Sequence, residues 1–154
     1  MIEAGEATPC YIGGRDYGSS PAEFQEERLL NEFAALKRPY NVISTWTPMV
    51  VPRSNWEAVG GFDEEYFPGS GSDPDFAMRM YRYGCRHFIG VGTSLVYHFS
   101  RTTISRFDSG PRMDPRSRFR RKWGMSRKRF LNRVLRRDRV ITPRLLPRTG
   151  TEAR

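Results

Sequence analysis

The net charge of +9 hides a division of charge along the chain that matters more than the total. Residues 1–100 hold 8 Lys and Arg against 13 Asp and Glu, a balance of −5. Residues 101–154 hold 18 Lys and Arg against 4 Asp and Glu, a balance of +14. The composition also changes after Ser100 to arginine, serine and proline. The sequence therefore predicts an acidic body followed by a basic tail.

The 154 residues suit one domain, and a content of 38% apolar and 13% aromatic residues is enough for a modest core. Cys10 and Cys85 lie far apart and have no CxxC partner, so we expect reduced thiols rather than a zinc cage or a disulfide framework. No stretch approaches the roughly 18 to 20 apolar residues of a membrane span, and the first thirty residues lack a signal-peptide pattern. A cytoplasmic protein is expected.

Capping and turn residues predict the first elements. Ser20-Pro21-Ala22-Glu23 has the pattern of a capping box with proline at the first helical position, and apolar residues recur after it at spacings of three to five. This pattern predicts a helix that runs to about Lys37. Between residues 40 and 51, β-branched and aromatic residues predict extended structure that is interrupted near Pro48.

A second capping box at residues 54–57 predicts a helix of one or two turns, which the pair Gly60-Gly61 ends. A helix is then expected from about Pro74 to Tyr83, closed by Gly84, and two short strands at 87–91 and 94–99. In the tail, Asp114-Pro115 and Ser126 each predict a helix start, and residues 137–154 are expected to fray.

Residues 60–80, GGFDEEYFPGSGSDPDFAMRM, gather five carboxylates within an otherwise basic chain. Because proline favours the first helical position, Asp73 is expected at the N-cap before Pro74, a local role worth about 1 kcal/mol. That role leaves the neighbouring carboxylates unexplained, since they would repel one another unless they are solvated or face a cation. A metal or a hydroxyl-bearing substrate is the alternative.

Three segments resemble the second half of the catalytic domain of family 2 glycosyltransferases, inverting enzymes with a GT-A fold. These are VPRSNWEAVGGFDEEYF, GSDPDFAMRMYRYGCRH and LVYHFS, and FRRKWG at residues 119–124 is similar to a later segment of that family. The resemblance covers about residues 40–124. Its order and spacing hold at ten positions: Gly60, Gly61, Phe62, Asp63, Glu64, Asp73, Asp75, Arg79, Gly84 and His98.

The resemblance implies that Asp73 is the general base that takes the proton from the acceptor hydroxyl. We expect the positive end of the helix to keep the pKa of Asp73 low. Asp75 is implied as a partner that supports the base from behind or as a group that orients the acceptor. The other residues implied on the acceptor side are Ser72, Asp63, Glu64, Arg79 and Trp46.

Ser72 stands where the family usually has glutamate, which puts the type of acceptor in doubt. The resemblance implies that His98 contacts a divalent cation, Mn²⁺ or Mg²⁺, on the diphosphate of a nucleotide sugar. A structural, hydrogen-bonded histidine is the alternative. Trp46 and Trp56 could each stack on a sugar or belong to the core. No nucleotide-binding residues are identified.

The donor-binding half of a GT-A enzyme, with its Asp-x-Asp motif, is not found in the sequence. We therefore expect either one piece of a split enzyme, with a protein partner that carries the missing half, or a truncated remnant. The basic tail could bind nucleic acid or an anionic membrane surface, which would make the protein a peripheral membrane protein. The plainer interpretation is a solvated basic face whose aromatic residues pack against the acidic body.

The sequence thus predicts an α/β chain with a partial GT-A-like fold, in which helices flank a short mixed sheet and a basic helical tail follows. Its expected parts are a turn and helix segment at 1–39, the acceptor-side half at 40–110 and the tail at 111–154. The predicted function is inverting transfer of a sugar from a nucleotide-sugar donor to a hydroxyl acceptor, with the activity of the isolated chain left open. The alternative is a noncatalytic binding module built on a decayed transferase half.

Overall fold

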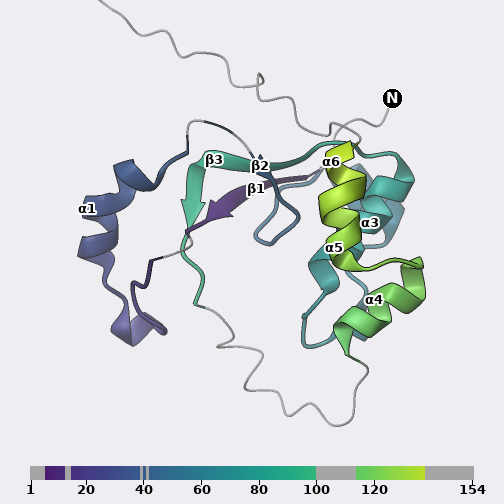
Figure 1. Ribbon diagram of the computed structural model, residues 1–154, viewed down its shortest axis with the longest axis horizontal. Helices are drawn as coiled ribbons and strands as arrows, with labels where there is room; N and C mark the ends of the chain where they lie inside the picture. The colour runs from purple at the N-terminus through teal and green to yellow at the C-terminus, as the bar shows by residue number, and fades with distance from the viewer. Residues whose placement is uncertain (1–5, 13–14, 39, 41, 100–113, 138–154) are drawn as a thin grey trace, which may run out of the picture.

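A three-stranded mixed sheet lies at the centre of the fold (Figure 1). The computed structural model describes residues 6–12, 15–38, 40, 42–99 and 114–137. In these ranges the strand order is β1 (Glu6–Tyr11), β3 (Phe88–Val96), β2 (Val42–Ile43). β1 is parallel to β3, whereas β2 is antiparallel to it. The expectation of a mixed α/β structure with a short sheet is therefore confirmed.

Strand β1 was not predicted from the sequence. It contains Pro9, which has no backbone N–H to donate, and it lies at the edge of the sheet, where strands tolerate proline. Its pairing with β3 shifts register between Pro9 and Cys10, so that Pro9 faces Val91 and Cys10 faces Leu95. Both cysteines of the chain are buried and free, as expected.

The other two strands differ from the prediction in length. The two strands expected at 87–91 and 94–99 are one continuous strand, β3, because β1 pairs with both parts of it through the register shift. The extended segment expected over residues 40–51 forms a strand only at Val42–Ile43. The strand predicted from β-propensity was therefore too long, since the length of a strand depends on the neighbouring strand with which it can pair.

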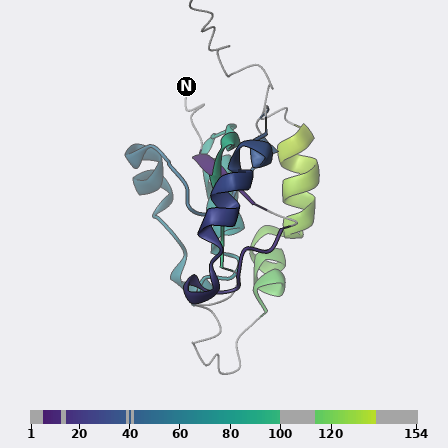
Figure 2. The same cartoon turned by 90° about the vertical axis from the view of Figure 1, so that its left-hand side faces the viewer.

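The helix predicted from Pro21 to Lys37 is wrong at its start. Pro21–Glu23 form a single 3-10 turn, η1, and α1 spans Glu26–Leu36. Ser20 makes no side-chain capping bond, and Phe24 between the two helices is extended, with φ −67° and ψ 122°. Its ring packs on Tyr97 and Phe99 at centroid distances of 5.7 and 5.4 Å. The tertiary contacts of this ring explain why the helix is interrupted at Phe24. Helix α1 faces the viewer in Figure 2.

Helix α2 (Arg53–Val59) is short, as predicted, and Gly60 ends it in a left-handed conformation with φ 76°. It begins two residues earlier than the capping box implied, after Pro52 and without a side-chain cap. A 3-10 turn, η2 (Glu64–Tyr66), and helix α3 (Ser72–Tyr83) follow, and Gly84 closes α3 as predicted. Trp56 contacts the rings of Phe62 and Phe76, although 37% of its surface stays exposed.

The two helix starts predicted in the tail are confirmed. Asp114 caps α4 (Pro115–Trp123) by accepting a bond from the Ser117 N–H, and Ser126 caps the next helical segment by accepting one from the Arg129 N–H. That segment comprises α5 (Arg127–Arg129), the π-helical turn η4 (Phe130–Val134) and α6 (Leu135–Arg137). The prediction of a frayed end concerns residues that lie, from 138 onward, outside the described ranges.

The tail helices contribute to the main hydrophobic core. Figure 1 shows α3 to α6 gathered on the right of the view, with α1 on the left and the sheet between them. The fully buried residues of this core come from α3, from Cys85 shortly after it, from Phe88 at the start of β3, and from the tail. They include Phe76, Met80, Phe88, Phe119, Phe130 and Leu135. The acidic body and the basic tail therefore share one core.

Candidate active site

The carboxyl ends of β1 and β3 lie at the same edge of the sheet because the two strands are parallel. Tyr11 is the last residue of β1, and His98 lies two residues beyond the end of β3. Their rings stack with a centroid distance of 5.4 Å and an angle of 12° between the planes. Open ends of parallel strands are common ligand sites in α/β proteins.

The start of α3 brings Asp73 to this edge. The carboxylate of Asp73 accepts hydrogen bonds from the backbone N–H and the side chain of Thr47, which lies in the loop after β2. The hydroxyl of Tyr11 donates to the backbone carbonyl oxygen of the same threonine. Four residues from four parts of the chain, Tyr11, Thr47, Asp73 and His98, thus form one cluster, which we call the Asp73 cluster.

The position of Asp73 differs from the prediction that it caps the helix. Gly71 is the N-cap residue of α3, with φ 94°, and Asp73 lies in the first turn. A side chain at Gly71 would have its Cβ 3.1 Å from the ring of Tyr66 and 3.2 Å from Pro115. The close approach of η2 and the tail therefore favours glycine at the cap, and the carboxylate of Asp73 binds Thr47 instead of its own helix.

The electrostatics of Asp73 also differ from the prediction. Burial raises the pKa of Asp73 above its ordinary value of 3.8, and this effect exceeds the lowering by the Thr47 hydrogen bonds and the charge of His98. The expectation of a low pKa is wrong because it counted the helix dipole and omitted desolvation. Burial and the charge of Asp73 in turn raise the pKa of Tyr11. The cluster is therefore a partly desolvated carboxylate beside an imidazole and a phenol.

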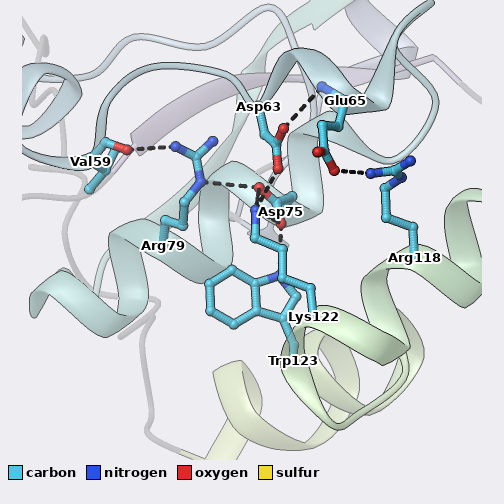
Figure 3. A network of polar contacts seen from close by, with 8 residues as sticks. All are labelled: Val59, Asp63, Glu65, Asp75, Arg79, Arg118, Lys122 and Trp123. Atoms are coloured by element: carbon cyan, nitrogen blue, oxygen red, sulfur yellow. Dashed lines mark hydrogen bonds and ion pairs between the residues drawn. The ribbon is translucent and has the colours of Figure 1, made fainter.

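Asp75 belongs to a second network of polar contacts (Figure 3). Its side chain is 0% exposed, and Trp123 donates its Nε1–H to Oδ1 at 2.7 Å. The Nζ of Lys122 lies 3.0 Å from Oδ1, and Nε of Arg79 lies 3.1 Å from Oδ2. Arg79 also donates to the carbonyl oxygen of Val59 at 2.6 Å. These contacts attach α4 to α3, while a role for Asp75 and Arg79 at the acceptor stays a prediction.

Lys122 extends this network to the acidic loop. Its Nζ lies 2.6 Å from Oδ2 of Asp63, and Oδ1 of Asp63 accepts a bond from the Glu65 N–H at 3.0 Å, which caps η2. These bonds lower the pKa of Asp63 against the opposing effect of burial. Arg118 pairs with Glu65 on the same surface. Basic residues of the tail therefore neutralise part of the acidic loop.

Three of the predicted acceptor residues line one pocket of about 550 Å³. Asp63, Glu64 and Ser72 belong to its wall, and the hydroxyl of Ser72 donates to the Gly69 carbonyl oxygen at 2.7 Å. The rest of the wall is largely aromatic and apolar: Phe62, Tyr66, Phe67, Pro68 and Gly69. We call this space the acidic pocket. Ser72 in its wall directly precedes Asp73 in the sequence.

Trp46 lies elsewhere, on a different pocket formed with the tail helices. It directly precedes Thr47, the hydrogen-bond partner of Asp73. The structure thus brings together Asp73 and His98 in one cluster, and Asp63, Glu64 and Ser72 in one pocket. Trp46 lies on a different pocket, and Lys122 links Asp63 to the buried pair of Asp75 and Arg79.

Tyr11 and Thr47 were missed as site residues. Tyr11 belongs to a strand that was not predicted, and Thr47 lies in a segment that was predicted as extended structure without a role. No local signal marks either residue, since their importance comes from contacts with Asp73 and His98, which are 26 or more positions away in the chain. Their part in the site is a result of the tertiary structure.

The described residues do not supply a cation site by themselves. No three His, Cys, Asp or Glu side chains converge within these ranges in a way that could hold a metal ion. Asp73 and His98 are two such groups, and the remaining members of their cluster are a tyrosine and a threonine. The role of His98 as a metal ligand stays a prediction, and the chemistry below has no step through a metal.

The fold and the cluster define a small mixed α/β protein with a carboxylate, an imidazole and a phenol at the carboxyl edge of two parallel strands. Comparison with protein-family models, with curated proteins and with solved structures found no match for the chain. Among the described helices, none has the length and apolar content needed to cross a lipid bilayer.

Proposed function

We propose that this chain is the acceptor-side part of an inverting glycosyltransferase with a GT-A-like fold, and that Asp73 is its general base. The donor is a nucleotide sugar, the acceptor carries a hydroxyl group, and a separate donor-binding half completes the enzyme. The observation that carries the proposal is the position of Asp73 and His98. These two residues were predicted as functional from the resemblance, and both belong to the cluster at the carboxyl ends of β1 and β3.

The environment of Asp73 suits proton abstraction. A carboxylate whose pKa lies above its ordinary value binds a proton more readily, and two bonds from Thr47 hold it in place. Positioning by these bonds matters as much as basicity, because a general base must lie within hydrogen-bond reach of the hydroxyl that it deprotonates. His98 is exposed, and its stacking on Tyr11 fixes the plane of its ring at the same edge.

In the proposed reaction, the acceptor oxygen attacks the anomeric carbon of the sugar while its proton passes to the carboxylate of Asp73. The new carbon–oxygen bond forms on one face as the bond from the anomeric carbon to the diphosphate oxygen breaks on the other. The configuration inverts, and the bonding electrons leave with the nucleoside diphosphate. A positioned general base of this kind contributes about 10²- to 10⁴-fold to the rate.

The acidic pocket is the proposed acceptor site. It starts next to Asp73 at Ser72, and the carboxylate of Glu64, which is exposed, can accept hydrogen bonds from sugar hydroxyls. Phe67 offers an exposed ring on which an apolar sugar face can pack. The carboxylates disfavour an anionic acceptor group in this pocket, so we propose a neutral polyhydroxyl acceptor.

The proposal is tested by reconstituting the chain with a donor-binding half and comparing Asp73→Asn with the parent. We expect turnover to fall by about 10²-fold or more, because the amide keeps the shape but accepts no proton. Glu57→Gln on α2, an exposed residue paired with Arg53, is the matched control and should leave turnover unchanged. Equal turnover of Asp73→Asn and the parent would reject the assignment.

A further inference from the structure

A second pocket, of about 560 Å³, lies between Trp46 and the tail helices. We call it the Trp46 pocket. Its volume falls within the range of roughly 300 to 1,000 Å³ that is usual for small-molecule sites. Most of its described wall consists of cationic and polar residues of the tail, which are Arg116, Ser126, Arg127, Lys128 and Asn132, and Leu131 adds an apolar side chain.

The described part of this pocket carries charge of one sign. Three cations line it, and the described residues of its wall include no aspartate or glutamate. Within the described ranges, Arg127 and Lys128 form no ion pair, whereas Arg118 and Lys122 on the neighbouring helix do. The hydrogen bond from the Ser117 N–H lowers the pKa of Asp114, and the nearby charge of Arg116 adds to this effect. Unpaired cations that share one concave surface produce a field that attracts an anion.

The pocket continues beyond these residues. A smaller hollow of about 250 Å³ shares Ser126, Lys128 and Asn132 with it and adds Arg129 and Arg133. The exposed face of the helical segment after Ser126 is therefore basic around the pocket, while its other face carries Phe130 and Leu135 into the core. The cations are thus held on a fixed helix rather than on a free tail.

Trp46 gives the pocket an aromatic wall. Its side chain is 41% exposed although the preceding Thr45 is fully buried, so the backbone beneath the ring is anchored. An exposed indole beside guanidinium and ammonium groups suits a ligand that carries both a flat or apolar ring and a negative charge. Arginine matches the oxygen geometry of phosphate better than lysine does, and two of the three lining cations are arginines.

We propose that the Trp46 pocket binds an organic phosphate or diphosphate. The phosphate lies against Arg116, Arg127 and Lys128, and the organic group packs on the indole of Trp46. This inference goes beyond sugar transfer and does not depend on it, since it concerns binding alone. A free nucleotide and a phosphorylated lipid headgroup share this chemistry, and the experiment below separates them.

The test uses the indole N–H resonance of Trp46 in the full chain, assigned by its loss in Trp46→Phe. The probes are inorganic pyrophosphate, uridine diphosphate, and vesicles of phosphatidylcholine with phosphatidylglycerol. We expect a saturable shift of the Trp46 signal with both soluble probes, smaller shifts for Trp56 and Trp123, and tighter binding of uridine diphosphate. In Trp46→Phe this resonance is absent, so calorimetric titration measures the two affinities there, and the advantage of uridine diphosphate over pyrophosphate should be reduced.

The decisive comparison is between two double variants that remove the same charge. Arg127→Gln with Lys128→Gln should weaken pyrophosphate binding by about tenfold or more, because two charge-assisted contacts are lost. Arg120→Gln with Arg121→Gln, on exposed positions of α4 outside the pocket wall, should change it by less than about threefold. Circular dichroism checks that both variants fold.

Three results would overturn the proposal. One is the absence of any saturable shift with the soluble probes, and another is an equal loss of affinity in the two double variants. The third is binding to the vesicles alone, which would indicate a membrane-facing basic surface instead of a phosphate pocket. If a glutamine variant unfolds, the comparison of the two soluble probes in Trp46→Phe still decides the question.

Discussion

Asp73 and Asp75 are two positions apart, yet the fold gives them different surroundings. Asp73 faces the edge of the sheet and binds Thr47, whereas Asp75 is enclosed by Arg79, Lys122 and Trp123. On a helix, residues two positions apart point in different directions, so a short acidic motif can serve two purposes. At the residue scale, the motif identifies the carboxylates, and the partners that surround each one define its role.

Asp73 is predicted to destabilise the fold at neutral pH. Folding raises the pKa of Asp73. The contribution of this side chain to the free energy of unfolding is therefore complete below its pKa in the unfolded chain, and it is lost as the pH rises through its pKa in the folded protein. Asp73→Asn stays neutral and can still accept the Thr47 N–H. We therefore expect the variant to be more stable than the parent at pH 7, with the difference shrinking toward pH 4, as measured by urea unfolding. A parent that is the more stable of the two at pH 7 would contradict this expectation.

The same ionisation predicts the pH dependence of the proposed activity. Asp73 must be deprotonated to act as a base, so kcat/KM should fall at acidic pH with a midpoint above 3.8, the ordinary value for aspartate. The measurement is a pH–rate profile of the reconstituted enzyme. A midpoint at or below the ordinary value would contradict the effect of burial on the pKa of Asp73.

Asp75 is predicted to be a major contributor to stability. Asp75→Ala would leave Arg79 and Lys122 without their shared buried partner, and the loss of one partner of a buried ion pair costs about 3–5 kcal/mol. Glu65→Gln is the matched control, because Glu65 is 73% exposed and an exposed pair contributes at most about 1 kcal/mol. Chemical denaturation of both variants measures the difference. Equal losses would contradict the buried network.

At the scale of elements, local signals predicted helix ends better than strand lengths. Gly60 and Gly84 end α2 and α3 as expected, and Asp114 and Ser126 cap the tail helices, since each signal acts within one turn. The capping box at Ser20 predicted a longer helix than the structure has, because the contacts of Phe24 end the helix after one turn. β1 and the full length of β3 depend on pairing between segments about 80 residues apart.

The helical segment after Ser126 is predicted to stabilise the fold through its apolar face, which packs into the core. Phe130 is fully buried between Phe119 and Tyr81, and Phe130→Ala should cost about 3–5 kcal/mol of unfolding free energy. Leu30→Ala on α1 is the control, because Leu30 is 60% exposed and surface changes stay within about 0.5 kcal/mol. Thermal and urea unfolding measure both. A loss at Phe130 no larger than at Leu30 would show that this helix is not part of the core.

At the scale of the whole molecule, opposite charge and shared apolar surface join the two regions. Lys122 and Arg118 from α4 pair with Asp63 and Glu65 of the acidic loop, while Phe119 inserts into the core beside them. The neutralising contacts are local, and the cations around the Trp46 pocket remain available to a ligand. The basic tail therefore has one surface that completes the fold and another that can bind.

A chain that ends at residue 113 is predicted to lose cooperative folding. It lacks Phe119, Phe130 and Leu135, which are fully buried against Phe76 and its neighbours. We expect broad thermal unfolding and binding of a dye that reports exposed apolar surface. A chain that ends at residue 137 keeps the described contacts and should unfold cooperatively, as the control. A sharp transition in the shorter chain, at the same midpoint, would contradict a shared core.

The sequence by itself determined the features that depend on neighbouring residues. These are the division of charge, the caps and glycine ends of the helices, and the identity of Asp73 and His98 as residues of interest. The tertiary structure alone decided that these two residues share a cluster with Tyr11 and Thr47, and that burial raises the pKa of Asp73. The physical reason is range: caps and turns act over a few residues, whereas burial and strand pairing depend on which distant segments meet.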